Sequence, residues 1–284
     1  MLLQHPSAEI YIPDDQPLPS ALSRITHLGI GAHQDDLEFM AFHGIIACLN
    51  SPTQWFGGVT CTDGAGSARS GPYTAFTDTQ MIAERRTEQR TAARLGNYAA
   101  MLQLGYASAV TRDPSDLRLQ QDLAQILVAT TPSIVYTHNP ADKHPSHIAV
   151  VIPVIQAIRS LPKSLRPQAV HGCEVWRSLD WMPDEEKITH DVSGHDPFAA
   201  QLNGLFSSQI SGGKRYDLAV IGRRHSNATF FNSHGVDQSS GLAFAIDLTP
   251  LILDDSLNII DYVSGFIDRF KADVVNQLQS FLRQ

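Results

Sequence analysis

Two short groups of histidine and carboxylate residues could support metal chemistry. The first is His33-Gln34-Asp35-Asp36 and the second is His144-Pro145-Ser146-His147. If the chain turns into a helix after His33, then His33 and Asp36 share one face and can bind one ion, while Asp35 stands near the ion without binding it. This spacing separates a ligand pair from a candidate base. The competing interpretation is that both aspartates only cap the N-terminus of a helix, whose dipole favours acidic residues.

The two histidines of the second group are three residues apart. One of them could complete a His/His/Asp metal set with His33 and Asp36, and the other would then stand beside the ion as a proton donor. The spacing alone carries little weight in a chain with 12 histidines. Both groups, however, follow expected strands, and the carboxyl ends of parallel strands meet at one edge of a sheet. The sequence therefore predicts a metal site at that edge.

Alternating strands and helices are expected to position these groups. Short apolar runs predict strands at residues 25–33, 55–61, 100–104, 132–137 and 169–176. Longer segments with helical composition or periodicity predict helices at 36–49, 79–95, 116–129 and 147–159. Strands that alternate with helices indicate an α/β, Rossmann-like, doubly wound and mostly parallel sheet, whose functional crevice lies at the carboxyl ends of the strands.

The remaining parts of the chain are less regular. Strands are expected at 217–221 and 242–246 and a helical tail at 257–282, which together form an elaborated C-terminal part. Because no repeat or linker separates this half, residues 25–284 are expected to form a single domain. Residues 1–24 contain four prolines and are predicted to form an extended arm over the domain or over a neighbouring subunit, which leaves a homo-oligomer open.

Composition excludes several classes of protein. A formal net charge of −8 and a pI near 5.8 argue against a nucleic-acid partner. Three scattered cysteines without CxxC spacing fit neither a disulfide framework nor a cysteine zinc site. The chain shows no secretion signal and no apolar run of the ~20 residues that span a membrane, so a cytoplasmic protein is expected. Gly29-Ile30-Gly31 begins a dinucleotide-binding pattern, but Gln34 stands at its third glycine.

Four motifs together resemble the PIG-L or LmbE-like family of zinc-dependent de-N-acetylases. The family's AHPDD signature corresponds to residues 32–36, its TxG segment to 59–64, its RxxExxxAxxLG helix to 85–96 and its HPDH to 144–147. The motifs follow the family's order across about residues 25–160. The resemblance implies that the chain is a zinc hydrolase that removes an acetyl, or another small acyl, group from the amine of a sugar-like small molecule.

The resemblance also implies a role for each matched residue. His33, Asp36 and His147 would hold Zn²⁺, Asp35 would be the general base, and a protonated His144 would stabilise the oxyanion. A zinc ion with three protein ligands leaves a position for water, lowers the pKa of that water toward ~7 and polarises an amide carbonyl. Asp35 could take the water's proton and pass it to the leaving amine, which gives acetate and a free amine.

Two arginines are expected to contact the substrate. Arg85 is assigned this role by the resemblance, and Arg69 lies in a Gly/Ser-rich loop from which it could reach an anionic or sugar group. Three positions depart from the family pattern: Gln34 replaces a proline and could loosen its turn, Ser146 replaces an aspartate, and Ala65 replaces an acidic residue. These changes indicate a divergent substrate rather than a lost metal.

Other functions fit the same residues. An amidase that cleaves a thiol conjugate, or a deacylase in natural-product assembly, would use the same side chains with a different pocket. A catalytically silent binding or assembly protein would explain the three departures. A non-haem iron oxygenase also uses two histidines and a carboxylate, but nothing in the sequence points to oxygen or a co-substrate.

Overall fold

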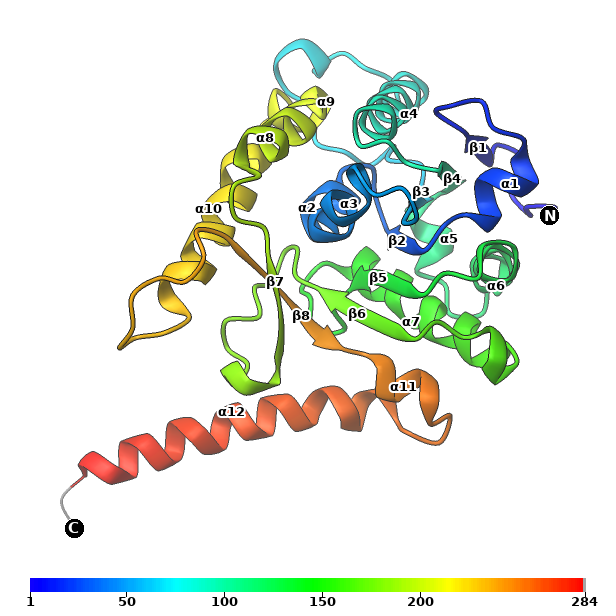
Figure 1. Ribbon diagram of the computed structural model, residues 1–284. Helices are drawn as coiled ribbons and strands as arrows, with labels where there is room; N and C mark the ends of the chain where they lie inside the picture. Colours follow the sequence, from blue (N-terminus) through cyan, green and yellow to red (C-terminus); the bar gives the residue numbers. More distant parts are fainter. Residues whose placement is uncertain (283–284) are drawn as a thin grey trace.

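An eight-stranded mixed sheet forms the centre of the protein in a computed structural model that describes residues 1–282 (Figure 1). The strand order is β1-β4-β3-β2-β5-β6-β8-β7. The strands span β1 Glu9–Tyr11, β2 His27–Gly31, β3 Phe56–Thr62, β4 Ala100–Tyr106, β5 Ile134–His138, β6 Ala169–Cys173, β7 Lys187–Asp191 and β8 Leu242–Asp247.

The five central strands, β4-β3-β2-β5-β6, run parallel, and antiparallel strands flank them on both sides. Every residue of β2, β3 and β4 is buried, as expected for parallel strands that are covered on both faces. The expected α/β, mostly parallel fold is therefore confirmed. At one edge β1 pairs with β4, and at the other β8 and β7 extend the sheet beyond β6.

Helices cover both faces of the sheet (Figure 1). On one face lie α2 Asp36–Met40, α3 Phe42–Leu49, α4 Asp78–Leu95, α8 Asp196–Gly204, α9 Ser207–Ile210 and α10 Tyr216–Phe230. On the other lie α1 Leu18–Ser23, α5 Ser108–Thr111, α6 Arg118–Thr130, α7 Pro145–Ser160 and α11 Thr249–Leu253. Two separate apolar clusters fill the two interfaces, which is the layered arrangement that buries one stripe of each helix.

The structure corrects several boundaries. The helix expected at 36–49 is two helices that meet at Ala41. The strand expected at 217–221 is wrong, because these residues form the first turns of α10. Strand β7 was not expected, and its sequence KITHD is polar and only partly buried, which gives it no apolar pattern. The segment 1–24 contains β1 and α1.

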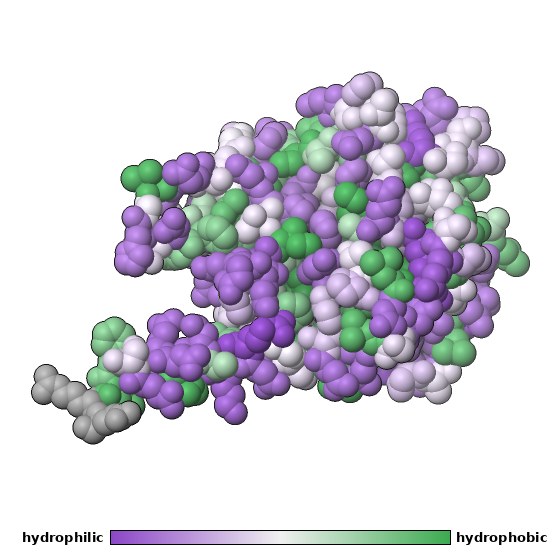
Figure 2. Space-filling view, turned by 60° about the horizontal axis from the view of Figure 1, so that its bottom comes forward, coloured by the Kyte–Doolittle hydropathy of each residue, from purple (hydrophilic) through white to green (hydrophobic). Residues whose placement is uncertain are grey.

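The last helix, α12, spans Ile259–Phe281 and extends away from the body of the molecule (Figures 1 and 2). Its 23 residues agree with the helical tail expected at 257–282, and Phe266 is its buried residue. Among the helices of residues 1–282, none combines the length and apolar content that crossing a membrane requires.

Candidate metal centre

The loop that joins β2 to α2 presents the first group of residues at the carboxyl end of the central strand. Asp36 is buried and its Oδ2 accepts the backbone N–H of His33 at 2.6 Å, while His33 Nδ1 lies 3.2 Å from the same oxygen. The other oxygen, Asp36 Oδ1, faces His147 Nε2 at 3.4 Å. Two side chains separated by 111 positions in the chain thus meet because β2 and β5 are neighbours in the sheet.

A carboxylate behind His147 fixes the orientation of its ring. His147 lies in the first turn of α7, and its Nδ1 donates to Asp142 Oδ2 at 3.1 Å. Asp142 also accepts the backbone N–H groups of Trp176 and Arg177, so this carboxylate cannot easily move. Because Nδ1 carries the hydrogen, the lone pair lies on Nε2, which is buried and has no hydrogen-bond partner among residues 1–282.

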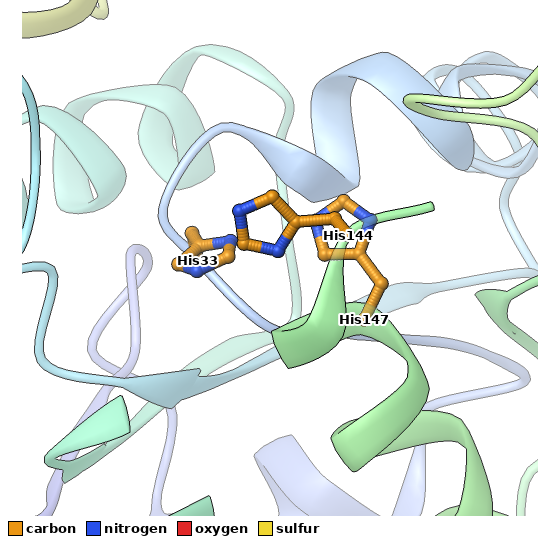
Figure 3. Close-up of side chains that lie close together, drawn as sticks. All are labelled: His33, His144 and His147. Carbon is orange, nitrogen blue, oxygen red and sulfur yellow. The ribbon is translucent and has the colours of Figure 1, made fainter. Parts of the chain in front are cut away.

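The arrangement of these atoms fits a zinc ion. Ligands of a tetrahedral zinc with bonds of ~2.0–2.2 Å lie about 3.4 Å apart, and this is the separation of Asp36 Oδ1 and His147 Nε2. Ligand atoms of His33, His144 and His147 also lie within 4.8 Å of one another, and Figure 3 shows the three rings gathered between the loop after β2 and the start of α7. The predicted ligands His33, Asp36 and His147 therefore lie together.

The charges around Asp36 favour its ionised form, which is the form that binds a metal. Burial opposes ionisation of Asp36, but His147, His138 and His33 hold its pKa well below its usual range. Burial alone would also lower the pKa of His147, but the carboxylates of Asp36 and Asp142 outweigh it and raise the pKa to about 9. The negative charges of Asp36 and Asp142 therefore favour a proton or a metal cation at His147.

His138, at the end of β5, was not singled out from the sequence. Its Nε2 lies 3.3 Å from Asp36 Oδ2 but accepts the backbone N–H of Ala32 at 2.9 Å. Its ring stacks on His147 with a centroid distance of 3.8 Å and an interplanar angle of 12°. Lone pairs of near-parallel stacked rings do not converge on one ion. His138 therefore supports the loop after β2 and the ring of His147 rather than serving as a ligand.

Asp35 occupies a strained backbone conformation beside the ligands. Its φ of 95° is unfavourable for a residue with a Cβ. Two side chains of α4 hold this conformation, since Gln89 accepts the backbone N–H of Asp35 at 3.1 Å and Arg85 donates to the carbonyl of Gln34. Arg85 Nη1 also lies 3.4 Å from Asp35 Oδ2. The other oxygen of Asp35 is left without a bond to Arg85.

The surroundings of Asp35 suit a proton acceptor that works near neutral pH. Burial raises its pKa to about 8; the guanidinium of Arg85 opposes this shift, while the Asp36 carboxylate adds to it.

His144, which precedes α7, stands at the other side of the centre. Its ring centroid lies 5.0 Å from that of His33 and 4.6 Å from that of His147, and its Nδ1 has no partner among the described residues. Burial, together with His147 and His33, lowers the pKa of His144 to about 4. These surroundings favour a neutral imidazole, which can still donate one hydrogen bond.

A cavity of about 490 Å³ opens above these residues. Its base contains His33, Asp35, Asp36, Arg85 and His144. The volume lies within the ~300–1,000 Å³ that is typical of small-molecule sites. Two of the predicted ligands, His33 and Asp36, and the predicted base Asp35 thus line one cavity.

The comparisons with known proteins agree with this geometry. Residues 28–158 match the sequence model of the PIG-L family, which carries the description GlcNAc-PI de-N-acetylase. The chain carries a PIG-L domain. No curated protein matched the chain.

Solved structures resemble the fold around the PIG-L domain at low sequence identity. A conserved protein of Thermus thermophilus is 18% identical, covers 82% of this chain and 99% of its own, and has a TM-score of 0.60. A 4-carboxy-2-hydroxymuconate hydratase of Pseudomonas putida is 16% identical over 79% of this chain and 96% of its own, with a TM-score of 0.58. An N,N'-diacetylchitobiose deacetylase of Pyrococcus horikoshii is 18% identical over 77% of this chain and 82% of its own, with a TM-score of 0.56. At this identity the likeness concerns the fold alone.

The two arginines predicted to contact substrate lie in different surroundings. Arg85 is buried and lines the cavity. Arg69 donates to Ala65 O at 2.8 Å and to Asp78 Oδ1 at 2.5 Å, and is not among the residues that line the cavity. Its contact with substrate stays a prediction.

Of the three departures from the family pattern, Gln34 has the clearest role. Its side chain is buried and donates to the carbonyl of Thr62 on β3 at 3.1 Å. Gly64, whose φ is +77°, leaves the room that Gln34 Oε1 needs, since a Cβ there would lie 2.7 Å from that oxygen. The glutamine therefore ties the turn to β3, and the expectation that it loosens the turn is wrong. Ser146 is buried and lines the cavity.

Sequence reasoning missed much of the cavity wall. Residues from the segment after the PIG-L domain close it, notably Trp176, Lys214, Tyr216 and Arg223, and Arg112 adds to it from the end of α5. No local spacing marks them, because they come from separate loops and helices. Asp142 was also missed as a partner of His147, although an acid five residues before a candidate ligand is a signal that could have been followed.

A second group of histidines, His43, His171 and His190, also brings ligand atoms within 4.8 Å. The rings of His43 and His190 stack in parallel, with a centroid distance of 3.7 Å and an interplanar angle of 6°. Their lone pairs lie in separate parallel planes and cannot both point to one ion. None of the three lines the cavity, so the first group is the better metal site.

Proposed function

We propose that this protein is a metal-dependent hydrolase that removes an acetyl or other small acyl group from the amine of a sugar-like small molecule. The observation that carries the proposal is the pair Asp36 Oδ1 and His147 Nε2, which lie 3.4 Å apart beside a cavity that Asp35 and Asp36 line. The PIG-L match and the chitobiose deacetylase neighbour support the same reaction.

The proposed ligands are His33, Asp36 and His147. A zinc ion held by them would supply a Lewis acid for the scissile carbonyl and would lower the pKa of a bound water. Asp142 contributes by keeping the hydrogen of His147 on Nδ1 and the lone pair on Nε2.

Asp35 is proposed to move the proton. Because Arg85 contacts Oδ2, the Oδ1 atom remains to accept a proton from the attacking water. Arg85 and Gln89 hold the loop in place during this transfer, and the same oxygen can return the proton to the nitrogen of the leaving amine.

His144 is proposed to stabilise the negative charge that develops on the carbonyl oxygen. Since burial favours its neutral form, it would do so as a neutral hydrogen-bond donor rather than as the imidazolium expected from the sequence. Trp176 and Tyr216, with ring centroids 6.0 Å apart, offer apolar surfaces for the face of a sugar ring.

The decisive experiment combines turnover and metal content. Zinc-loaded wild type and Asp35→Asn are incubated with N-acetylglucosamine and its methyl glycoside, and acetate release and bound zinc are measured. We expect Asp35→Asn to keep about one zinc per chain and to lose 10²–10⁴-fold in kcat, the range typical of a general base. Asp122→Asn is the matched control, because Asp122 is also buried but bonds Tyr106 away from the cavity.

Two results would overturn the proposal. One is a wild-type protein that binds zinc and hydrolyses none of a panel of N-acyl amino sugars and N-acyl thiol conjugates, which would favour a silent binding protein. The other is equal turnover by wild type and Asp35→Asn.

A further inference from the structure

Three cations line the cavity, of which Arg112 and Lys214 are exposed and Arg223 is half-buried. Arg112 donates to the carbonyl of Ser108 at 2.9 Å, and Arg223 donates to the carbonyl of Val175. Lys214 Nζ lies 5.3 Å from the centroid of the Trp176 ring. Within residues 1–282 none of the three forms a salt bridge, although the guanidinium of Arg223 is close enough to the Glu174 carboxyl to favour its ionised form.

This concentration of positive charge is unusual for a chain with a formal net charge of −8. Among the described residues that line the cavity, the acidic ones are Asp35 and Asp36, which lie at its base with the metal ligands. Glu174 lies behind Arg223, but it accepts hydrogen bonds from Asn227 and the backbone N–H of Leu179 and does not line this cavity. The positive electrostatic potential of such a cleft attracts anions.

We propose that Arg112, Lys214 and Arg223 form an anion subsite, and that the substrate carries a phosphate or carboxylate group at a distance from the scissile amide. The inference rests on the proposed function and adds the class of substrate. Guanidinium groups bind carboxylate and phosphate oxygens in a fork, and the ammonium of Lys214 adds a third donor. The aromatic pair Trp176 and Tyr216 lies in the same wall and would contact the part of the substrate between the anion and the amide.

The test compares matched substrates that differ in charge. The kcat/KM for acetate release is measured with methyl N-acetylglucosaminide, N-acetylglucosamine 1-phosphate and N-acetylmuramic acid, at low and at high NaCl. We expect at least one anionic substrate to exceed the neutral one tenfold or more at low salt, mainly through KM, and the advantage to shrink in high salt. The phosphate and carboxylate arms distinguish the two forms of anion.

Variants then test whether these cations cause the preference for anionic substrates. Lys214→Gln and Arg223→Gln should each reduce kcat/KM for the anionic substrate by a factor at least five times larger than the change they cause in kcat/KM for the neutral substrate. Lys163→Gln, an exposed cation of the short helix at Lys163–Leu165, is the control and should change neither. Equal kcat/KM values for neutral and anionic substrates in the active wild type would overturn the subsite and leave the proposed function standing.

A protein that hydrolyses none of these compounds would overturn the function, and binding would then decide the subsite. Calorimetric titration with glucosamine 1-phosphate and with methyl glucosaminide measures it without turnover. Tighter binding of the phosphate that Arg223→Gln abolishes supports the subsite, and equal or absent binding of both compounds overturns it.

Helix α12 carries a second, independent inference. From Ile267 onward every described residue of this helix is exposed. Its apolar side chains recur every seven residues at Ile260, Ile267, Val274 and Phe281, and a second, shorter series three positions later consists of Val263 and Phe270 and ends at Gln277. A seven-residue repeat with β-branched residues at its first position is typical of two-stranded coiled coils.

We infer that α12 of one chain pairs with α12 of a second copy. The exposed apolar side chains from Ile267 to Leu282 amount to on the order of 800 Å², about what each partner contributes to a stable interface. The helix carries three acidic residues (Asp261, Asp268 and Asp273) and two basic ones (Arg269 and Lys271), whereas a helix that binds an anionic membrane is rich in Lys and Arg on its polar face. A symmetric dimer covers this stripe with an identical one.

Light scattering coupled to gel filtration tests the pairing on the full chain. We expect wild type and the control Asn276→Asp to be dimers at about 20 μM, and the double variant I267D/V274D to be a monomer whose thermal midpoint differs little. A monomeric wild type at this concentration overturns the inference, and so does a double variant that remains dimeric.

Discussion

Replacing Asp142 by Asn should place the hydrogen of His147 on the wrong nitrogen. Asp142 Oδ1 accepts the backbone N–H groups of Lys143, His144 and Arg177, whereas Oδ2 accepts from Trp176 N–H and His147 Nδ1. The single oxygen of an asparagine will face the three donors, so its NH₂ group faces His147. The imidazole must then accept at Nδ1 and carry its hydrogen on Nε2, the atom that faces Asp36.

The expected loss of zinc affinity follows from the free-energy cost of a hydrogen on His147 Nε2. Removing the partner that orients a metal-binding histidine costs 10–100-fold in metal affinity, which corresponds to about 1.4–2.7 kcal/mol. The NH₂ group also opposes the Trp176 N–H, which adds a loss in the free energy of unfolding of about 1–3 kcal/mol. The two effects are measured separately, by zinc titration against a chromophoric chelator at pH 7.5 and by urea unfolding of the metal-free protein.

A matched control isolates the role of His147. Asp113 also accepts a backbone N–H, that of Ser115, but it is exposed and contacts no histidine. Asp113→Asn should leave the zinc affinity unchanged. If Asp142→Asn binds zinc within twofold of the wild-type affinity, then His147 Nε2 does not contact the ion and the proposed ligand set is wrong.

Three further outcomes are expected. Burial raises the pKa of Glu38 from 4.5 to about 7, so the stability that this group contributes is fully present below pH 4.5 and is lost as the pH rises through 7. The free energy of unfolding of Glu38→Gln should therefore rise relative to that of wild type between pH 5 and 8. If the two free energies, measured by urea unfolding, change in parallel with pH, the expectation is wrong. Ser208→Ala removes the hydroxyl that donates to Glu88 Oε2 at 2.6 Å and should lower the free energy of unfolding by about 1–3 kcal/mol, whereas a loss below about 0.5 kcal/mol would show that the bond contributes little. Zinc at 100 times its Kd should raise the free energy of unfolding of the metal-free protein by about 2.7 kcal/mol. An equal rise for Asp36→Ala would refute binding at this centre.

The part of the site that the sequence predicted is the part that follows strand ends. His33, Asp36, His144 and His147 belong to short groups that come directly after β2 and β5, and neighbouring parallel strands bring such groups together without further information. Local spacing therefore predicted His33 and Asp36 with one of the two later histidines and set Asp35 apart as a candidate base, and the resemblance assigned His147 as the ligand and His144 to the oxyanion.

The rest of the site depends on contacts between distant segments. Arg112, Lys214 and Arg223 meet at one cavity from α5, the loop before α10, and α10 itself, and an isolated cation on a helix or loop is most often solvated. Arg69 shows the converse, because an arginine in a loop beside the site is bound to Asp78, nine residues away.

The errors in the fold have similar causes. Residues 217–221, Asp-Leu-Ala-Val-Ile, form a short apolar run such as a buried strand has, but the helix that contains them continues through a polar stretch to Phe230 and packs against α8 and β8. Strand β7 owes its pairing to β8 rather than to its own composition.

Under the proposed function, the residues that carry out the reaction and many of those that would contact the rest of the substrate come from different parts of the chain. The proposed metal ligands and the proposed proton acceptor all lie before residue 148, whereas eight of the residues that line the cavity lie between positions 175 and 223 on other loops and helices. Exchanges of side chains in that later stretch can therefore retune which molecule is accepted without touching the coordination geometry. Evolution, or an engineer, can vary the two properties independently in this architecture.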